Sequence, residues 1–177
     1  MTKLYFAYGS NVNLNQMADR CLAAEVVGAV ILEDYKLLFR GNYRGTGVAT
    51  IKPHKGRKVY GLLWNITPEC EKALDVYEGF PRLYDKQFVT VRDSNGHQFT
   101  VMAYVMTELC KMPATPSVIY YMGIREGFLQ NSLPVKALDK AVHHAQKEVA
   151  AFYSKDHYQT ALWMDEKQKK RRTEHER

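Results

Sequence analysis

The chain of 177 residues is long enough for one domain with a well-developed core, and its 46% apolar and 25% charged residues are typical of globular proteins. No run of about 18 apolar residues occurs, which excludes a membrane-spanning helix. Residues 1–10 hold one lysine and a short mixed apolar run. This pattern predicts a strand rather than a signal peptide, so we expect a cytoplasmic protein.

The formal net charge of +6 is unevenly distributed along the chain. Residues 167–172 carry five positive charges and no negative one, and without them the net charge is +1. Because such runs are usually solvated tails, we expect a domain over residues 1–160 and a flexible basic tail over 161–177. The domain has no basic excess that favours nucleic-acid binding. Binding of nucleic acid or an acidic partner through the tail stays open as an alternative.

The three cysteines, Cys21, Cys70 and Cys110, are odd in number, far apart and without a C-x-x-C pair. This pattern predicts neither a disulfide framework nor a zinc site, and it favours a reducing compartment in which the cysteines pack in the core. The adjacent His143 and His144 would point in different directions from a helix, which disfavours joint metal binding. We therefore expect no metal.

The first half of the chain reads mainly as strands. Residues 3–8 form an aromatic-rich predicted strand, and a short helix follows from about Asn13, because Leu14, Met17 and Cys21 share one helical face. Further strands are predicted, in order, at residues 26–32, 35–39, 48–51 and 59–66. A glycine-rich loop over 41–47 separates the second of these from the third.

The second half begins with a helix. Thr67 and Pro68 are a typical N-cap and first helical residue, and the helix they start should run to about Tyr77 and stop at Gly79. A hairpin and two helices then follow, at residues 88–92 paired with 99–106 around Asn95-Gly96, and at 117–129 and 135–153. Many short strands followed by terminal helices predict a mixed α/β (α+β) domain with a curled or barrel-like sheet.

The turn Tyr8-Gly9-Ser10-Asn11 is the first candidate for chemistry. Glycine lets a backbone approach a ligand closely, and the free N–H groups at a helix start favour an anion or a developing negative charge. The same four residues are also common in ordinary strand-to-helix turns, so local chemistry alone leaves both interpretations open.

Glu78 is the second candidate. At the C-terminal end of a helix the dipole disfavours its negative charge, and Tyr77 and Phe80 can remove water from it. Both effects would raise the carboxyl pKa toward the range useful in acid/base catalysis, although the local sequence alone favours a solvated surface glutamate. Tyr84 and Tyr120 either line a pocket or simply pack with local hydrogen bonds.

Four motifs in this order resemble the γ-glutamylcyclotransferase family over roughly residues 3–134. The motifs are Tyr8-Gly9-Ser10-Asn11, Gly47-Val48-Ala49-Thr50-Ile51, Leu74-Asp75 leading into Glu78-Gly79, and Pro116-Ser117 with Tyr120. Each motif is weak alone, but their order makes the resemblance specific. From Val135 onward nothing matches.

The resemblance implies a small mixed β-barrel packed with helices and a γ-glutamylcyclotransferase activity that releases 5-oxoproline, as in glutathione metabolism. It implies Glu78 as the catalytic acid/base. It also implies a small-molecule γ-glutamyl substrate that is held by Tyr8, Gly9, Ser10, Asn11, Tyr84 and Tyr120. No cofactor is required, and a homodimer is left open.

Two alternatives lie within the same fold. The leaving group can be something other than a simple amino acid, such as a γ-glutamylamine or a larger γ-glutamyl conjugate, because residues 80–84 differ from the simplest family pattern. A member of the fold that only binds a ligand is the other alternative, although the glutamate at position 78 argues against it. Fold alone does not decide between them.

Overall fold

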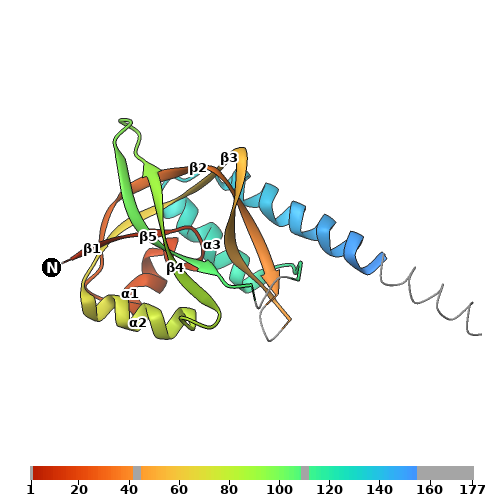
Figure 1. Cartoon of the computed structure of the whole chain (residues 1–177), viewed down its shortest axis with the longest axis horizontal. Helices are drawn as coiled ribbons and strands as arrows, with labels where there is room; N and C mark the ends of the chain where they lie inside the picture. The colour runs from red at the N-terminus through yellow and green to blue at the C-terminus, as the bar shows by residue number, and fades with distance from the viewer. Residues whose placement is uncertain (1, 42–44, 109–111, 155–177) are drawn as a thin grey trace, which may run out of the picture.

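The protein folds as a closed five-stranded β-barrel with helices against it, which confirms the predicted mixed α+β fold class (Figure 1). The computed structural model describes residues 2–41, 45–108 and 112–154. The strand order is β1-β3-β2-β4-β5, with β1 parallel to β5 and the other mapped pairs antiparallel. The strands are β1 (Lys3–Ala7), β2 (Glu25–Gly41), β3 (Gly47–Ile66), β4 (Tyr84–Arg92) and β5 (Gln98–Met106).

Strands β2 and β3 form one long hairpin, where the sequence predicted four short strands. The expected break falls at a register shift between Glu33 and Tyr35, not at a turn. Asp34 there takes a left-handed backbone conformation (φ 58°), and its side chain accepts a hydrogen bond of 2.7 Å from the Gly56 N–H. This bond joins the two strands across the irregularity, so pairing continues. The prediction of separate strands was therefore wrong, and β4 also begins four residues earlier than predicted.

The caps predicted for the helix after residue 66 are confirmed. In α2 (Pro68–Glu78), the Thr67 side chain accepts a hydrogen bond from the Cys70 N–H, and Gly79 ends the helix with a φ of 66°. Glycine adopts this left-handed conformation without a steric penalty. Glu78 is consequently the last helical residue, where the sequence placed it. Asn13 caps α1 (Leu14–Arg20) in the same way, through two backbone N–H groups.

Helix α3 (Val118–Gln130) packs against the turn that follows β1. The turn contains a short 3₁₀ helix, η1 (Ser10–Val12). A Cβ atom added to Gly127 would lie 2.5 Å from the Asn13 backbone nitrogen, so only glycine allows this approach. The Asn13 side chain also donates to the Gly123 carbonyl and to Glu126, each at 2.9 Å. Helix α3 therefore supports the turn from behind.

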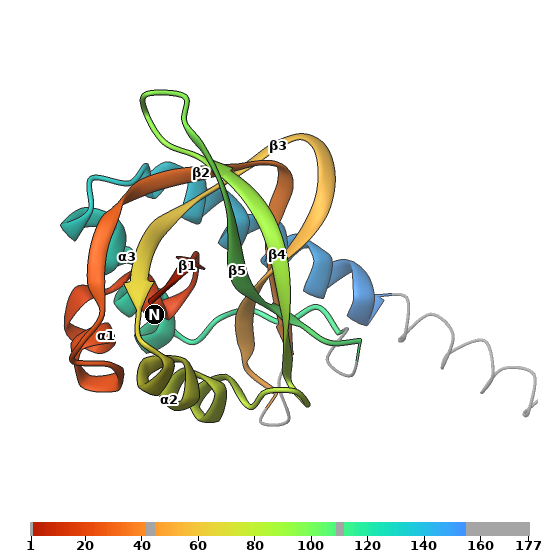
Figure 2. The ribbon, with the colours of Figure 1, turned by 60° about the vertical axis from the view of Figure 1, so that its left-hand side comes forward.

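A further helix spans residues 135–154 and runs away from the barrel (Figures 1 and 2). It adds Leu138 and Ala145 to a core whose largest fully buried side chains include Phe6, Phe39 and Phe128. Within the described ranges, no helix has both the length and the apolarity that crossing a bilayer requires. The predicted tail over 161–177 lies outside the described residues.

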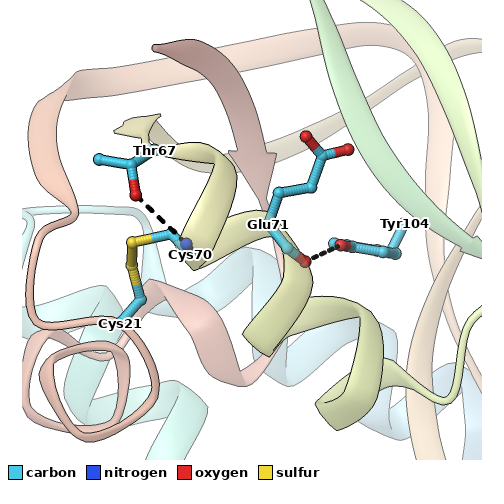
Figure 3. The surroundings of a disulfide bond; sticks show 5 residues. All are labelled: Cys21, Thr67, Cys70, Glu71 and Tyr104. Atoms are coloured by element: carbon cyan, nitrogen blue, oxygen red, sulfur yellow. Dashed lines mark hydrogen bonds between the residues drawn. A yellow bond between two sulfur atoms is a disulfide. The ribbon is translucent and has the colours of Figure 1, made fainter. Parts of the chain in front are cut away.

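A disulfide joins Cys21, at the end of α1, to Cys70 in the first turn of α2 (Figure 3). Their Cα atoms lie 5.1 Å apart, within the range for disulfides. The prediction that these cysteines are unpaired was wrong, and with it falls the argument from cysteines for a reducing compartment. The residues are 49 positions apart in the sequence, so only the side-by-side packing of α1 and α2 brings them together. Cys110 lies outside the described residues.

Candidate functional site

A cavity of about 400 Å³ opens beside the turn that follows β1, and we call it the Glu78 pocket. It is formed by this turn, the C-terminal end of α2, and residues from the barrel strands and α3. Its lining consists of Tyr5, Tyr8, Gly9, Ser10, Asn11, Val48, Ala49, Tyr77, Glu78, Leu83, Tyr84, Tyr104 and Tyr120. All seven residues that the sequence nominated for the site are among them.

Glu78 is the charged residue of the pocket wall. Its Oε1 accepts a hydrogen bond of 2.8 Å from Asn11 Nδ2. Burial raises the pKa of the Glu78 carboxyl to about 7, while the Asn11 hydrogen bond and the Arg20 charge act in the opposite direction. The sequence anticipated the direction of this shift. Burial of the carboxyl, which removes water from it, is the main cause of the raised pKa. Tyr77 lies at the rim of the pocket and is 47% exposed.

Asn11 is fixed on all sides and is 2% exposed. Its Nδ2 donates to the Tyr5 hydroxyl as well as to Glu78, both at 2.8 Å. Its Oδ1 accepts from the Arg20 guanidinium at 2.6 Å, and its backbone carbonyl accepts from Trp64 Nε1 at 3.0 Å. With both polar atoms of its side chain bonded, the Asn11 amide has one orientation, and that orientation holds the Glu78 carboxyl in place.

Arg20 stands directly behind the pocket wall, and the sequence analysis did not identify it. From the end of α1 its guanidinium donates to Asn11 and, at 3.2 Å, to Ser10 Oγ. A further bond of 2.8 Å reaches Gln16, and the guanidinium carbon lies 3.8 Å from the centre of the Tyr77 ring. No local pattern distinguishes Arg20 from a solvated helix residue, because its role depends on the packing of α1 against α2.

The backbone at Gly9 passes close to the opposite wall. A Cβ atom added to Gly9 would lie 3.2 Å from the Ala49 Cβ and 3.4 Å from the Tyr120 hydroxyl. The N–H groups of Val12 and Asn13 close the 3₁₀ turn onto the Gly9 and Ser10 carbonyls at 3.1 Å. The preceding N–H groups, those of Ser10 and Asn11, lie at the start of the turn, where a helix has no internal acceptor for them.

Tyr84 and Tyr120 both bond to the backbone of Ala49 in β3. The Tyr84 hydroxyl donates to the Ala49 carbonyl at 2.6 Å, and the Ala49 N–H donates to the Tyr120 hydroxyl at 3.2 Å. The Tyr8 hydroxyl is fixed in a similar way by the Tyr104 carbonyl. Burial raises the pKa of Tyr8, Tyr84 and Tyr120, so these phenols stay neutral near pH 7. The pocket thus has rigid neutral walls around one titratable carboxyl.

Two tyrosines of the pocket were missed by the sequence analysis. Tyr5 supports Asn11 from β1, and Tyr104 donates a hydrogen bond of 2.6 Å to Asp75 on α2. The aromatic richness of residues 3–8 was visible in the sequence, but the direction of each ring was not. Alternation along β1 would have placed Tyr5 on the interior face only after the strand partners were known.

Comparison with known proteins agrees with this geometry. The family model described as "Gamma-glutamyl cyclotransferase, AIG2-like" matches residues 5–121. The γ-glutamylcyclotransferase of Bos taurus is 33% identical over 141 residues, which cover 75% of this chain and 73% of that protein. Its counterpart of the same name from Homo sapiens is 32% identical over 145 residues, covering 77% and 76%.

A solved structure described as "Gamma-glutamyl cyclotransferase" is also similar, with 32% identity and a TM-score of 0.73. The similarity covers 80% of this chain and 86% of that chain. YkqA from Bacillus subtilis, at 20% identity and a TM-score of 0.70, shares the fold. The chain therefore belongs to the γ-glutamyl cyclotransferase, AIG2-like family, which confirms the resemblance and the enzyme class that the four motifs predicted.

Proposed function

We propose that the Glu78 pocket binds the γ-glutamyl group of a small-molecule substrate and releases it as 5-oxoproline. The observation that carries this proposal is the Glu78 carboxyl, which is bonded to Asn11 at the pocket wall and has a pKa raised to about 7. A carboxyl that titrates near neutrality can both take and return a proton at physiological pH. Membership of the family supports the same class of reaction.

Glu78 acts first as a base. The α-amine nitrogen of the γ-glutamyl group attacks its own γ-carbonyl carbon and closes a five-membered ring. This amine is largely protonated at neutral pH, so a base must remove a proton before it can act as a nucleophile. Since Asn11 occupies Oε1 of Glu78, we assign the proton transfer to Oε2.

Glu78 then acts as an acid. Ring closure leaves a tetrahedral carbon that carries a negative oxygen. The ring nitrogen then carries two hydrogens and loses one of them to solvent. When the bond from the tetrahedral carbon to the leaving nitrogen breaks, Glu78 returns its proton to that nitrogen and regains its charge, and the released amine takes up its second proton from solvent. The nucleophile and the electrophile belong to one molecule, so a pocket that holds the substrate folded supplies most of the required proximity. The atoms balance without an oxidant, a reductant or a cofactor.

The turn after β1 supplies donors for the negative oxygen. The N–H groups of Ser10 and Asn11 lie at the open start of η1, and the close approach of Gly9 to Ala49 fixes their position. Backbone donors held in this way stabilise developing charge without having to reorganise during the reaction. Tyr8, Tyr84 and Tyr120 form the neutral walls against which the γ-glutamyl chain would fold.

The lining of the pocket also bears on the leaving group. Among the described residues that line it, Glu78 carries the only full charge, and no Lys, Arg or His is present. A leaving group with its own carboxylate would find no cation in this described part of the wall. This observation favours, as a second candidate, a γ-glutamylamine whose leaving amine carries no carboxylate.

Release of 5-oxoproline from a panel of γ-glutamyl amino acids, γ-glutamylamines and glutathione tests the proposal. We expect Glu78→Gln to lower kcat/KM by about 10²–10⁴-fold, the usual contribution of an acid/base residue. Glu69→Gln is the matched control, because Glu69 is an exposed carboxylate in the first turn of the same helix. Equal activity in wild type and Glu78→Gln, with both folded by circular dichroism, would refute the assignment. The preferred panel member identifies the leaving group.

Several finer predictions from the sequence remain proposals. They are a cytoplasmic location, a substrate from glutathione metabolism, a homodimer, and a domain boundary near residue 160. Light scattering on the purified full chain decides the oligomeric state. Protection of residues up to about 160 from limited proteolysis would support the boundary, and cleavage well inside the barrel would contradict it.

A further inference from the structure

A second cavity of about 630 Å³ lies between the bend of the β2–β3 hairpin and the helix over residues 135–154. Its lining comes from β2, β3 and the first half of the helix, with Lys36 and Leu37 from β2 and His54, Gly56, Arg57, Lys58 and Tyr60 from β3. Figure 2 shows this helix passing behind the two strands. The cavity shares no lining residue with the Glu78 pocket. It is therefore a separate feature of the fold.

The lining of this cavity is strongly basic. Lys36, Arg57, Lys58, Lys136 and Lys140 line it, and we call the cavity with these five residues the basic groove. No Asp or Glu is among the lining residues in the described ranges. The net charge of the chain is +6 in total, +1 without residues 167–172, and −4 when the five groove residues are also left out. Five of the 25 lysines and arginines of the chain thus line one cavity.

The carboxylates that contact groove residues also have partners outside the groove. Glu33 pairs with Lys58 at 3.2 Å but also with Arg92 at 2.5 Å. Asp34 accepts from the Gly56 N–H, as described above. Glu148 is held by Arg40 at 2.9 Å, although Lys36 and His144 also lie near it.

Four of the five cations are therefore available to bind a ligand. Lys36, Arg57, Lys136 and Lys140 form no ion pair within the described part of the chain. Lys136 and Lys140 are four positions apart on one helix, so they share a face and project toward the same space. Arg57 approaches from β3, on the other side of the cavity. The charges surround a common volume.

We propose that the basic groove binds a ligand with several linked phosphate groups. The volume is that of a small-molecule site, so the ligand must carry several negative charges within a short length. Linked phosphates meet this requirement, and arginine and lysine are the usual partners of phosphate oxygens. A long nucleic acid or an acidic peptide would instead need a basic track that continues over the surface.

Titration calorimetry of the full chain with inorganic tripolyphosphate, in low-salt buffer, tests this proposal. We expect saturable binding that weakens as salt is added, since the contacts are ionic. Lys136→Gln with Lys140→Gln should weaken binding at least tenfold. Lys72→Gln, at an exposed lysine of α2, is the matched control and should bind as wild type does. A nucleoside triphosphate in place of tripolyphosphate shows whether a base adds affinity to the phosphate chain.

The basic run over residues 167–172 is the main competing explanation for any binding. A variant with Lys169, Lys170, Arg171 and Arg172 changed to Gln separates the two regions. Binding that survives in this variant and is lost in the groove variant supports the proposal. Loss in the tail variant with full binding in the groove variant overturns it. So does an absence of binding, or a clear preference for single-stranded RNA or poly-glutamate over tripolyphosphate.

Discussion

The Glu78 pocket and the basic groove are built from opposite kinds of side chains. In the pocket, Asn11, Tyr8 and Tyr84 are buried with hydrogen-bonded side chains, and the neighbouring Glu78 carboxyl has a raised pKa. In the groove, Lys36, Lys136 and Lys140 form no ion pair within the described part of the chain, and Lys58 shares Glu33 with Arg92. Acid/base chemistry needs one group held in one geometry, whereas binding of a polyanion needs only many charges near one volume.

The disulfide is the strongest test of how the pocket is held. Cys21→Ser with Cys70→Ser should lower the free energy of unfolding by about 2–4 kcal/mol, since the bond closes a long loop in the unfolded chain. Urea denaturation measures this difference. Wild type treated with a reductant should lose the same stability, and the double variant should not respond to the reductant. Equal stability of wild type and double variant would show that α1 and α2 are held by packing alone.

Asn11 tests whether orientation of the carboxyl matters. Asn11→Ala removes the hydrogen bond to Glu78 and leaves the Arg20 guanidinium without one of its acceptors. We expect kcat/KM to fall by about 10–100-fold, from the usual 1.5–3 kcal/mol of a hydrogen bond to a charged group. Asn95→Ala, at the exposed β4–β5 turn, is the control. An unchanged kcat/KM in Asn11→Ala would mean that the Glu78 carboxyl is positioned by other contacts.

Arg20 tests the contribution of charge, rather than of hydrogen-bond geometry, to the state of Glu78. Its positive charge lowers the pKa of Glu78 against the effect of burial, so Arg20→Gln should move the pKa above 7. We expect roughly a tenfold loss of kcat/KM at pH 7, because less of the base form is present. Arg20→Lys keeps the positive charge, so the pKa of Glu78 should stay close to its wild-type value. The same variant loses the paired hydrogen bonds to Ser10 and Asn11. A downward shift in Arg20→Gln would contradict this account.

The groove should have the smallest effect on catalysis. Because the two cavities share no residue, Lys136→Gln with Lys140→Gln should change 5-oxoproline release by less than about twofold, within the additivity expected of distant sites. The assay is the panel described above, without added phosphates. A large loss in this folded variant would mean that the two regions are coupled and that the contrast between them is wrong.

Elements with strong local signals could be predicted from the sequence. The Thr67-Pro68 start of α2 and its Gly79 stop depend on the chemistry of the caps, which is local. The bend of the β2–β3 hairpin could not be predicted. Residues 52–58 are exposed and polar, so they lack the alternation that marks a strand, and the Asp34–Gly56 bond that joins the strands spans 22 positions.

The pocket divides in the same way. Residues in contiguous motifs, such as Gly9 and Glu78, could be nominated because the resemblance to the family depends on them. Arg20 and the Cys21–Cys70 disulfide could not, since both depend on how α1 lies against α2. The raised pKa of Glu78 was anticipated from its place at a helix end and from desolvation by Tyr77 and Phe80, but the extent of its burial depends on the assembled pocket.

The pH dependence of Glu78 tests the central claim most directly. The base form must be ionised, so kcat/KM should fall about tenfold for each pH unit below the pKa of about 7. A carboxyl carbon NMR titration of wild type, assigned by its absence in Glu78→Gln, should give the same midpoint. Agreement of the two midpoints near 7 is the predicted result. Titration of Glu78 near 4.3, the ordinary value for glutamate, would contradict the account.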